Sequence, residues 1–196
     1  MRPRSEAPAR ILEAAIDVIE SGGEVAIRVH DLANSCGVTG PILYRAFGSR
    51  EGLIEAAQTE RYRRSLLELD VIIESMAGCT TAEALHDALH RAVDQALGDR
   101  NGRRVRANII GSSITRPALA ASIAALHRST IDRIATAWQT AQSNGLLRPG
   151  TDLRALAAWW LGQLDSRVHL ELSAGHVDDA AWDDIARRSL VGALLA

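Results

Sequence analysis

The stretch that most constrains the fold of this chain is residues 29–50, VHDLANSCGVTGPILYRAFGSR. Leu32, Ala33 and Cys36 have the i, i+1, i+4 spacing of one helical face. Gly37 follows, at the position where the C-terminus of a helix favours a residue that tolerates positive φ. The stretch therefore predicts a short helix, a tight turn and a second short helix.

The second helix of this pair begins with a cap and is predicted to expose one face. Thr39 is expected to accept a backbone N–H with its hydroxyl, and Pro41 falls in the first turn, where a missing N–H costs nothing. Leu43 and Phe47, four residues apart, are predicted to be buried. The opposite face is predicted to present Gly40, Ile42, Tyr44 and Arg45 to solvent. A helix-turn-helix places such a face in the major groove of DNA, but ordinary helical hairpins also contain glycine turns, so both remain open.

The run GVTGPILYRAFGSREGLIEAA resembles the signature of TetR-family bacterial transcription regulators. The matching residues are Gly37, Val38, Thr39, Leu43, Tyr44, Phe47, Ser49, Arg50, Glu51 and Leu53. The chain departs from the family pattern in two places. Arg28 and Val29 occupy the region where the family often has a Ser or Thr cap, and Ile42 occupies a position that is often Thr. Beyond this signature, the chain resembles the family only in length and helical character.

The resemblance implies that the partner is a double-stranded DNA operator. The residues that it implies for DNA contact are His30, Thr39, Gly40, Pro41, Ile42, Tyr44 and Arg45, with Arg50 as a phosphate anchor. The hydroxyls of Thr39 and Tyr44 are expected to bind phosphate, which positions the protein without reading sequence. Arg45 could pair with guanine edges or with phosphate.

The net charge limits how the chain could bind nucleic acid. With 22 basic and 24 acidic residues the formal net charge is −2, which argues against histone-like coating of DNA and leaves room for a local basic surface. Arginines gather around the motif and the helix after it, at Arg45, Arg50, Arg61, Arg63 and Arg64. All the basic residues are Arg, a bias for which GC-rich coding DNA is sufficient explanation.

The remaining patterns argue against an enzyme, a metalloprotein and a membrane protein. The chain has no phosphate-binding loop, nucleophile elbow, zinc-protease or dinucleotide-binding motif, so we expect neither catalysis nor a cofactor. Cys36 and Cys79 lack metal-ligand spacing, and His86 and His90 lack a third ligand, so no metal is expected. Without an apolar leader or a run of about 18 apolar residues, we expect a cytoplasmic protein with no membrane partner.

Helical periodicity recurs from end to end and predicts an all-α fold of about nine helices. Residues 1–50 are expected to form the helix-turn-helix DNA-binding domain, packed on a linking helix over residues 49–77 that is capped by Ser49. Residues 78–196 are expected to form a helical domain for effector binding and dimerisation. Its longer helices are predicted from Pro117 to Gly145, over residues 151–174 and over residues 177–195.

The last two helices are apolar on two sides, which requires burial on two sides. A second copy of the chain could cover the outer side, and a two-fold homodimer is the commonest such arrangement. The residues predicted at the dimer interface are Trp160, Leu164, Val168, Trp182, Ile185 and Ser189. TetR-like proteins dimerise through these helices, which would set two recognition helices roughly 34–36 Å apart.

The resemblance also implies a cavity in the second domain for a small effector, expected to be apolar or aromatic. The residues predicted to line it are Ile109, Ile110, His127, Trp138 and Trp159, each of which could equally be an ordinary core residue. The whole predicts a ligand-responsive regulator, in the first instance a repressor that binds a palindromic operator as a dimer. An all-helical small-molecule-binding protein, a regulator without an effector and a monomeric interaction protein remain as alternatives.

Overall fold

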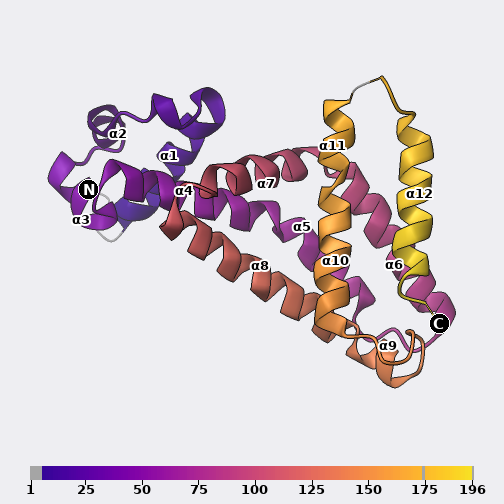
Figure 1. Ribbon diagram of the computed structural model, residues 1–196. Coiled ribbons are helices and arrows are strands. Elements are labelled where there is room, and N and C mark those ends of the chain that lie inside the picture. Colours follow the sequence, from indigo (N-terminus) through magenta and orange to yellow (C-terminus); the bar gives the residue numbers. More distant parts are fainter. Residues whose placement is uncertain (1–5, 174, 196) are drawn as a thin grey trace. The chain divides into compact units, whose positions relative to one another are not determined.

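The computed structural model describes residues 6–173 and 175–195, and this part of the chain is helical (Figure 1). Within it the only extended pairing is an isolated antiparallel bridge between Leu147 and Leu195, which confirms the predicted all-α fold. The first helices are α1 (Ala7–Gly22), the 3-10 turn η2 (Glu24–Ala26), α2 (Val29–Ser35), α3 (Gly40–Phe47), α4 (Arg50–Ser65) and α5 (Leu67–Met76). They are followed by α6 (Ala82–Gly98), α7 (Arg100–Ser113), α8 (Pro117–Ala137), α9 (Gln139–Ser143), α10 (Leu153–Asp165), α11 (Arg167–Leu172) and α12 (Asp179–Gly192).

The chain divides into two compact units. The N-terminal unit comprises the residues up to Arg64 together with Ser112–Ile123, and the C-terminal unit comprises Ser65–Gly111 and the residues from Ala124 onward. The division differs from the predicted domains, because α4 belongs almost wholly to the N-terminal unit. The turn between α7 and α8 and the first part of α8 also belong to that unit, although they are distant from it in sequence.

The helix-turn-helix is the centre of the N-terminal unit. α1 packs on α2 and α3, and its residues Ile11, Ile16 and Ile19 meet Leu32 and Leu43 in one buried cluster. Burial of such aliphatic side chains stabilises the unit by roughly 1.5–3 kcal/mol for each one. The motif is thereby held on a packed core, with the outer face of α3 left uncovered.

The turn between α2 and α3 has the predicted geometry at its glycine. Gly37 has φ +63°, and Gly48 ends α3 with φ +76°. Thr39 occupies the N-cap of α3, but its side chain accepts no capping hydrogen bond. The reason is local: Pro41 has no N–H to donate, and the Ile42 N–H donates to the Thr39 carbonyl at 3.0 Å. Ser49 does cap α4, because its hydroxyl accepts from the Gly52 N–H at 2.9 Å.

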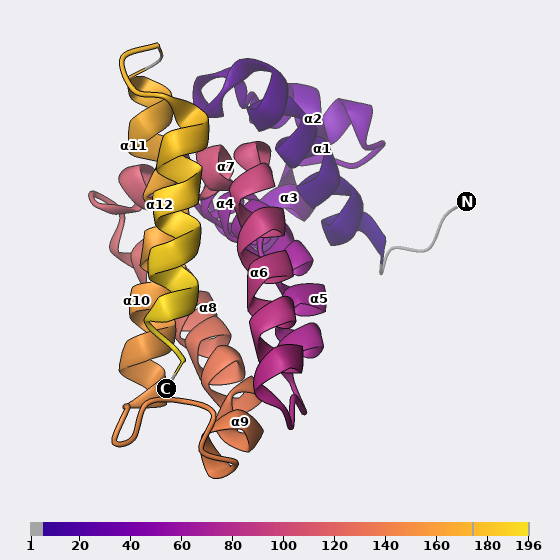
Figure 2. The same ribbon diagram turned by 90° about the vertical axis from the view of Figure 1, so that its right-hand side faces the viewer.

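The C-terminal unit is a helical bundle in which α6 packs against α5, α10 and α12 (Figure 2). Two tryptophans lie at its core. The rings of Trp138 and Trp160 meet edge to face, with centroids 5.9 Å apart, and the Trp138 Nε1–H donates to Met76 Sδ at 3.4 Å. Two arginines of α7 are buried in this unit. Arg103 donates to the last carbonyls of α6, and Arg106 donates to Asp165 at 2.8 Å. No sequence signal had indicated that these arginines would be buried.

Three helices that the periodicity predicts as continuous are interrupted. The breaks lie at Leu66, Trp138 and Ser166. Leu66 and Trp138 are buried, so core packing rather than helix propensity determines their backbone. At Ser166 the hydroxyl donates to the Gln163 carbonyl at 2.6 Å, a local bond that competes with the helical pattern.

Among the described residues, no helix combines the length and the apolar character that crossing a membrane would require.

Candidate functional site

The outer face of α3 carries exposed polar side chains that are available for contact with a partner. Thr39 and Arg45 are exposed, and Tyr44 is 48% exposed. Within the described residues, Arg45 forms no ion pair or side-chain hydrogen bond, and the Thr39 hydroxyl makes no capping bond. Two hydroxyls and one cation therefore face outward from the first two turns of α3. This is the part of a recognition helix that lies closest to bases and phosphates.

The remaining residues predicted for α3 are accessible to different degrees. Pro41 is exposed, and Gly40 and Ile42 are partly exposed at the beginning of the helix. Because Gly40 has no side chain, the backbone there can approach a partner closely. Ile42 presents an apolar group where a polar one would bind phosphate, and such a group suits a thymine methyl.

Arg50 is bound within the N-terminal unit. Its guanidinium donates to the Ile27 carbonyl at 3.1 Å, to the Glu24 carbonyl at 2.8 Å and to the Glu51 carboxylate at 2.7 Å. All three nitrogens therefore make hydrogen bonds inside the unit, and Arg50 connects η2 and the residue after it to the beginning of α4. A phosphate contact at Arg50 stays a prediction, and it would require exchange of one of these bonds.

The predicted basic surface is also largely neutralised within the unit. Arg61 and Arg64 pair with glutamates of α1, and Arg63 pairs with Glu60 at 2.7 Å. The hydrogen bond from Arg63 lowers the pKa of Glu60 to about 2, so this carboxylate stays charged. Of the five arginines predicted for this surface, Arg45 is the one that the described residues leave without an acidic partner.

Arg28 and His30 lie at the beginning of α2. Arg28 is exposed, and its guanidinium donates to the Val25 carbonyl at 2.7 Å, so its charge has no carboxylate against it among the described residues. The His30 ring is exposed and its Nδ1 lies 3.1 Å from Asn34 Nδ2. The sequence had marked Arg28 only as a departure from the usual cap. Its position makes it the better candidate for the phosphate contact predicted at Arg50.

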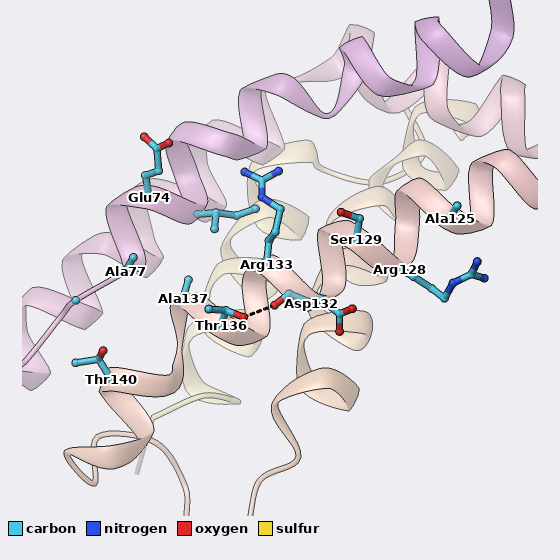
Figure 3. A pocket seen from close by; sticks show the side chains of 12 residues that line it. Glu74, Ala77, Ala125, Arg128, Ser129, Asp132, Arg133, Thr136, Ala137 and Thr140 are labelled. Carbon is cyan, nitrogen blue, oxygen red and sulfur yellow. Dashed lines mark hydrogen bonds between the residues drawn. The ribbon is translucent and has the colours of Figure 1, made fainter. Parts of the chain in front are cut away.

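A groove of about 700 Å³ lies between α5 and α8 in the C-terminal unit (Figure 3). Its walls carry apolar, hydroxyl and charged side chains. The lining residues are Ile73, Glu74, Ala77, Gly78, Ala125, Arg128, Ser129, Asp132, Arg133, Thr136, Ala137 and Thr140. Two of the charges are already paired, Arg133 with Asp70 and Asp132 with Arg154, both at 2.6 Å. Within the described part of the chain, Glu74 and Arg128 make no ion pair.

Both the motif and the whole chain are similar to known proteins. The sequence profile of the bacterial regulatory proteins of the tetR family matches residues 11–57, which include most of α1 and all of α2 and α3. The HTH-type transcriptional regulator UidR of Escherichia coli (strain K12) is 24% identical over 194 residues, covering 95% of this chain and 91% of UidR. The N-terminal helix-turn-helix is therefore similar to that of tetR-family regulators, and most of the chain is similar to UidR.

Solved structures share the fold of this chain. A TetR-family transcriptional regulator from Mesorhizobium loti MAFF303099 superposes with a TM-score of 0.75 at 15% identity, and all of both chains is covered. A transcriptional regulator from Saccharomonospora viridis in complex with choline has a TM-score of 0.66 at 20% identity, covering 98% of this chain and 99% of that one. The chain shares with both structures a fold of a helix-turn-helix followed by a helical bundle.

The groove between α5 and α8 is not lined by the residues that the sequence predicted for an effector. Ile109 and Trp138 have no exposed surface, and both are core residues of the C-terminal unit, so these two predictions need correction. Ile110 and Trp159 are exposed, at 42% and 40%, but neither lines the groove. His127 is partly exposed on α8, between groove residues on either side of it in sequence, and it is absent from the lining. For Ile110, Trp159 and His127, effector binding stays a prediction.

The residues predicted at a dimer interface differ in how accessible they are. Trp182, Ile185 and Ser189 line a shallow hollow with Trp159 of α10, and Ile185 is 57% exposed. Trp160 and Leu164 need correction: their exposed fractions are 0% and 2%, so a partner has nothing left to cover. Val168, on α11, is partly exposed and does not line this hollow.

His86 and His90, on α6, form a close ring pair. Their Nε2 atoms lie 3.2 Å apart, and the side chain of Asp87 lies 3.6 Å from His86. Among the described residues, no group of three or more His, Cys, Asp or Glu side chains could hold a metal ion.

Proposed function

We propose that this chain is a TetR-family regulator that binds a palindromic DNA operator as a homodimer, represses transcription there, and is released by a small molecule bound in the groove between α5 and α8. The observation that carries the DNA-binding part is the outer face of α3. Tyr44, Arg45 and Thr39 present two hydroxyls and an unpaired cation on a helix whose other face is fixed in a core.

The proposed DNA contacts are of two kinds: phosphate contacts, which position the protein, and base contacts, which recognise the sequence. Thr39 and Tyr44 donate their hydroxyls to phosphates, with Arg28 as a further phosphate contact at the beginning of α2. Arg45 reaches base edges, where an arginine pairs bidentately with guanine, and Ile42 contacts a thymine methyl. A net charge of −2 suits this arrangement, because a few directed contacts rather than a wide basic surface then bind the DNA.

Dimerisation is proposed through the exposed sides of α10 and α12. Trp159, Trp182 and Ile185 make this face apolar, whereas Gln163 and Ser189 add polar groups beside them. Aromatic side chains are enriched at protein interfaces because they bury a large area with few rotatable bonds. A second copy would cover the same patch of the first, as two-fold symmetry requires, and would double the number of recognition helices.

The groove is proposed to take a small polar effector. Its hydroxyls at Ser129, Thr136 and Thr140 and its unpaired charges at Glu74 and Arg128 suit a charged, hydrogen-bonding molecule. The expectation of an apolar or aromatic effector rested on Trp138 and Trp159, and neither lines the groove. A volume of about 700 Å³ lies within the range of ligand pockets. The S. viridis protein of the same fold has been crystallised with choline, which is a small charged molecule.

The test of DNA binding is fluorescence anisotropy on the intergenic DNA beside the gene and on duplexes enriched from a random library by the purified protein. Scrambled DNA of equal length is the control. We expect a preference of about 10³ or more for the specific duplex, with affinity falling as salt rises. Equal and weak binding to all duplexes would contradict sequence-specific recognition. Repression is tested with a reporter gene placed under the enriched sequence. The protein should lower reporter expression, whereas an activator would raise it.

A further inference from the structure

One carboxylate joins four distant segments of the N-terminal unit. Glu24, in η2, accepts from Gln58 Nε2 at 2.6 Å, from Ser112 Oγ at 3.1 Å and from both terminal nitrogens of Arg116, at 2.8 and 2.5 Å. These four residues form the Glu24 network. They join η2, α4, the end of α7 and the turn that precedes α8.

The network is charged, partly shielded from water and geometrically specific. The side chains of Arg116 and Glu24 are 25% and 20% exposed, and their contact is a bidentate guanidinium–carboxylate pair. Burial by itself raises the pKa of Glu24, but the hydrogen bonds from Arg116 and Gln58 outweigh it and hold the pKa below its usual value. Arg50 also binds the Glu24 backbone carbonyl. The η2 turn is therefore fixed through its backbone and its side chain.

The position of Arg116 gives this network a second role. Arg116 directly precedes α8, which runs without interruption from Pro117 to Ala137. The first part of α8 belongs to the N-terminal unit, whereas residues of the same helix from Ala125 onward line the groove. A continuous α-helix transmits an axial displacement along its length, because every turn is hydrogen-bonded to the next. A molecule that shifts the groove portion of α8 would thereby displace Arg116.

The other end of the network leads to the recognition helix. Glu24 precedes Ile27, which is fully buried in the cluster that also contains Leu32 of α2 and Leu43 of α3. We propose that the Glu24–Arg116 pair is the connection through which occupancy of the groove changes the position of the helix-turn-helix. This inference rests on the proposed function, and it adds the residues that couple the effector site to DNA binding.

The experiment uses a groove-filling substitution in place of the unidentified effector. Ser129→Trp adds a bulky side chain to the groove wall on α8. It is combined with Glu24→Gln, which keeps the shape and removes the charge, and separately with Arg116→Gln. The matched control is Glu13→Gln, because Glu13 is an exposed partner of Arg64 in the same unit and lies outside the network. Affinity for the library-enriched duplex is measured for each full-length variant.

We expect Ser129→Trp to weaken duplex binding about tenfold in the wild-type and Glu13→Gln backgrounds, a typical size for coupling between sites. In the Glu24→Gln and Arg116→Gln backgrounds the same substitution should change affinity less than about twofold. An equal loss in all backgrounds would overturn the proposed route, and so would a Ser129→Trp variant that binds like wild type.

Hydrogen exchange of the α2 and α3 amides gives a second measurement that needs no DNA. Ser129→Trp should change exchange there only when Glu24 and Arg116 are both present, and unchanged exchange would overturn the connection. If no duplex is enriched but the exchange result holds, the DNA-binding proposal fails while the connection stands. If the duplex binds specifically but the network variants respond like wild type, only the connection fails.

Discussion

Replacing Trp160 with Ala tests the burial that distinguishes it from its neighbour Trp159. Trp160 has no exposed surface, and a buried tryptophan removes about 150–250 Å² from water, which corresponds to roughly 4–6 kcal/mol. Loss of the edge-to-face contact with Trp138 adds about 0.5–1.5 kcal/mol. The Trp160 Nε1–H is buried without a partner among the described residues, so removing it offsets about 1–3 kcal/mol of the destabilisation. We expect a net destabilisation of roughly 3–5 kcal/mol.

Urea unfolding followed by far-UV circular dichroism measures this cost at a series of protein concentrations. Trp160→Phe should cost less than half as much, because a ring remains against Trp138 and the unpartnered donor is removed. Trp159→Ala should cost less than about 1 kcal/mol once dilution has separated the subunits, because dimerisation contributes to the apparent stability only at higher concentration. A cost below about 1 kcal/mol for Trp160→Ala, or equal costs at both positions in dilute protein, would refute the assignment of the two faces.

Three further outcomes follow from the same structure. Arg45→Ala should weaken binding to the enriched duplex by about 1–3 kcal/mol without changing the sedimenting mass, and unchanged affinity would remove Arg45 from the interface. Ile185→Arg places a charge on the apolar face of α12 and should shift sedimentation towards the monomer, so a dimer of native mass would argue against this face. Because the pKa of folded Glu24 is lowered, its contribution to stability is present above the usual value of 4.5 and is lost as pH falls through the lowered pKa. The difference in unfolding free energy between wild type and Glu24→Gln should therefore shrink below about pH 4.5, and a constant difference from pH 7 to pH 3 would show that the charge is not what matters.

The helix-turn-helix could be predicted from the sequence because its signals are local. The Gly37 turn, the spacing of Leu32 and Leu43 and the Ser49 cap each depend on residues only a few positions apart. The breaks at Leu66 and Trp138 could not be predicted, because a buried side chain in contact with distant helices determines the backbone there. Helical periodicity predicts one continuous helix wherever the apolar pattern continues, and it does not report breaks that are caused by packing in the core.

The sequence did not indicate contacts between residues that are distant along the chain, and it did not decide between two apolar faces. Arg50 matches the family signature, yet the carbonyls that accept its hydrogen bonds lie in η2 and at Ile27, more than twenty residues earlier. Along residues 153–168 the periodicity correctly separates a stripe through Trp160 from another through Trp159. It cannot determine which stripe faces the subunit's own core, because both are apolar and only the packing of α6 and α12 decides.

The discontinuous N-terminal unit determines how this regulator could be recombined with its relatives. A chimera that joined a foreign helix-turn-helix at residue 64 would separate Glu24 from Ser112 and Arg116, which lie in the same unit but later in the chain. The transplanted segment must include residues 112–123 as well, or the recipient must already have an arginine at the end of its α7–α8 turn and a carboxylate before α2. The part of this chain that can be exchanged as a unit is therefore defined by three-dimensional contacts. A single junction in the gene would not keep that unit together.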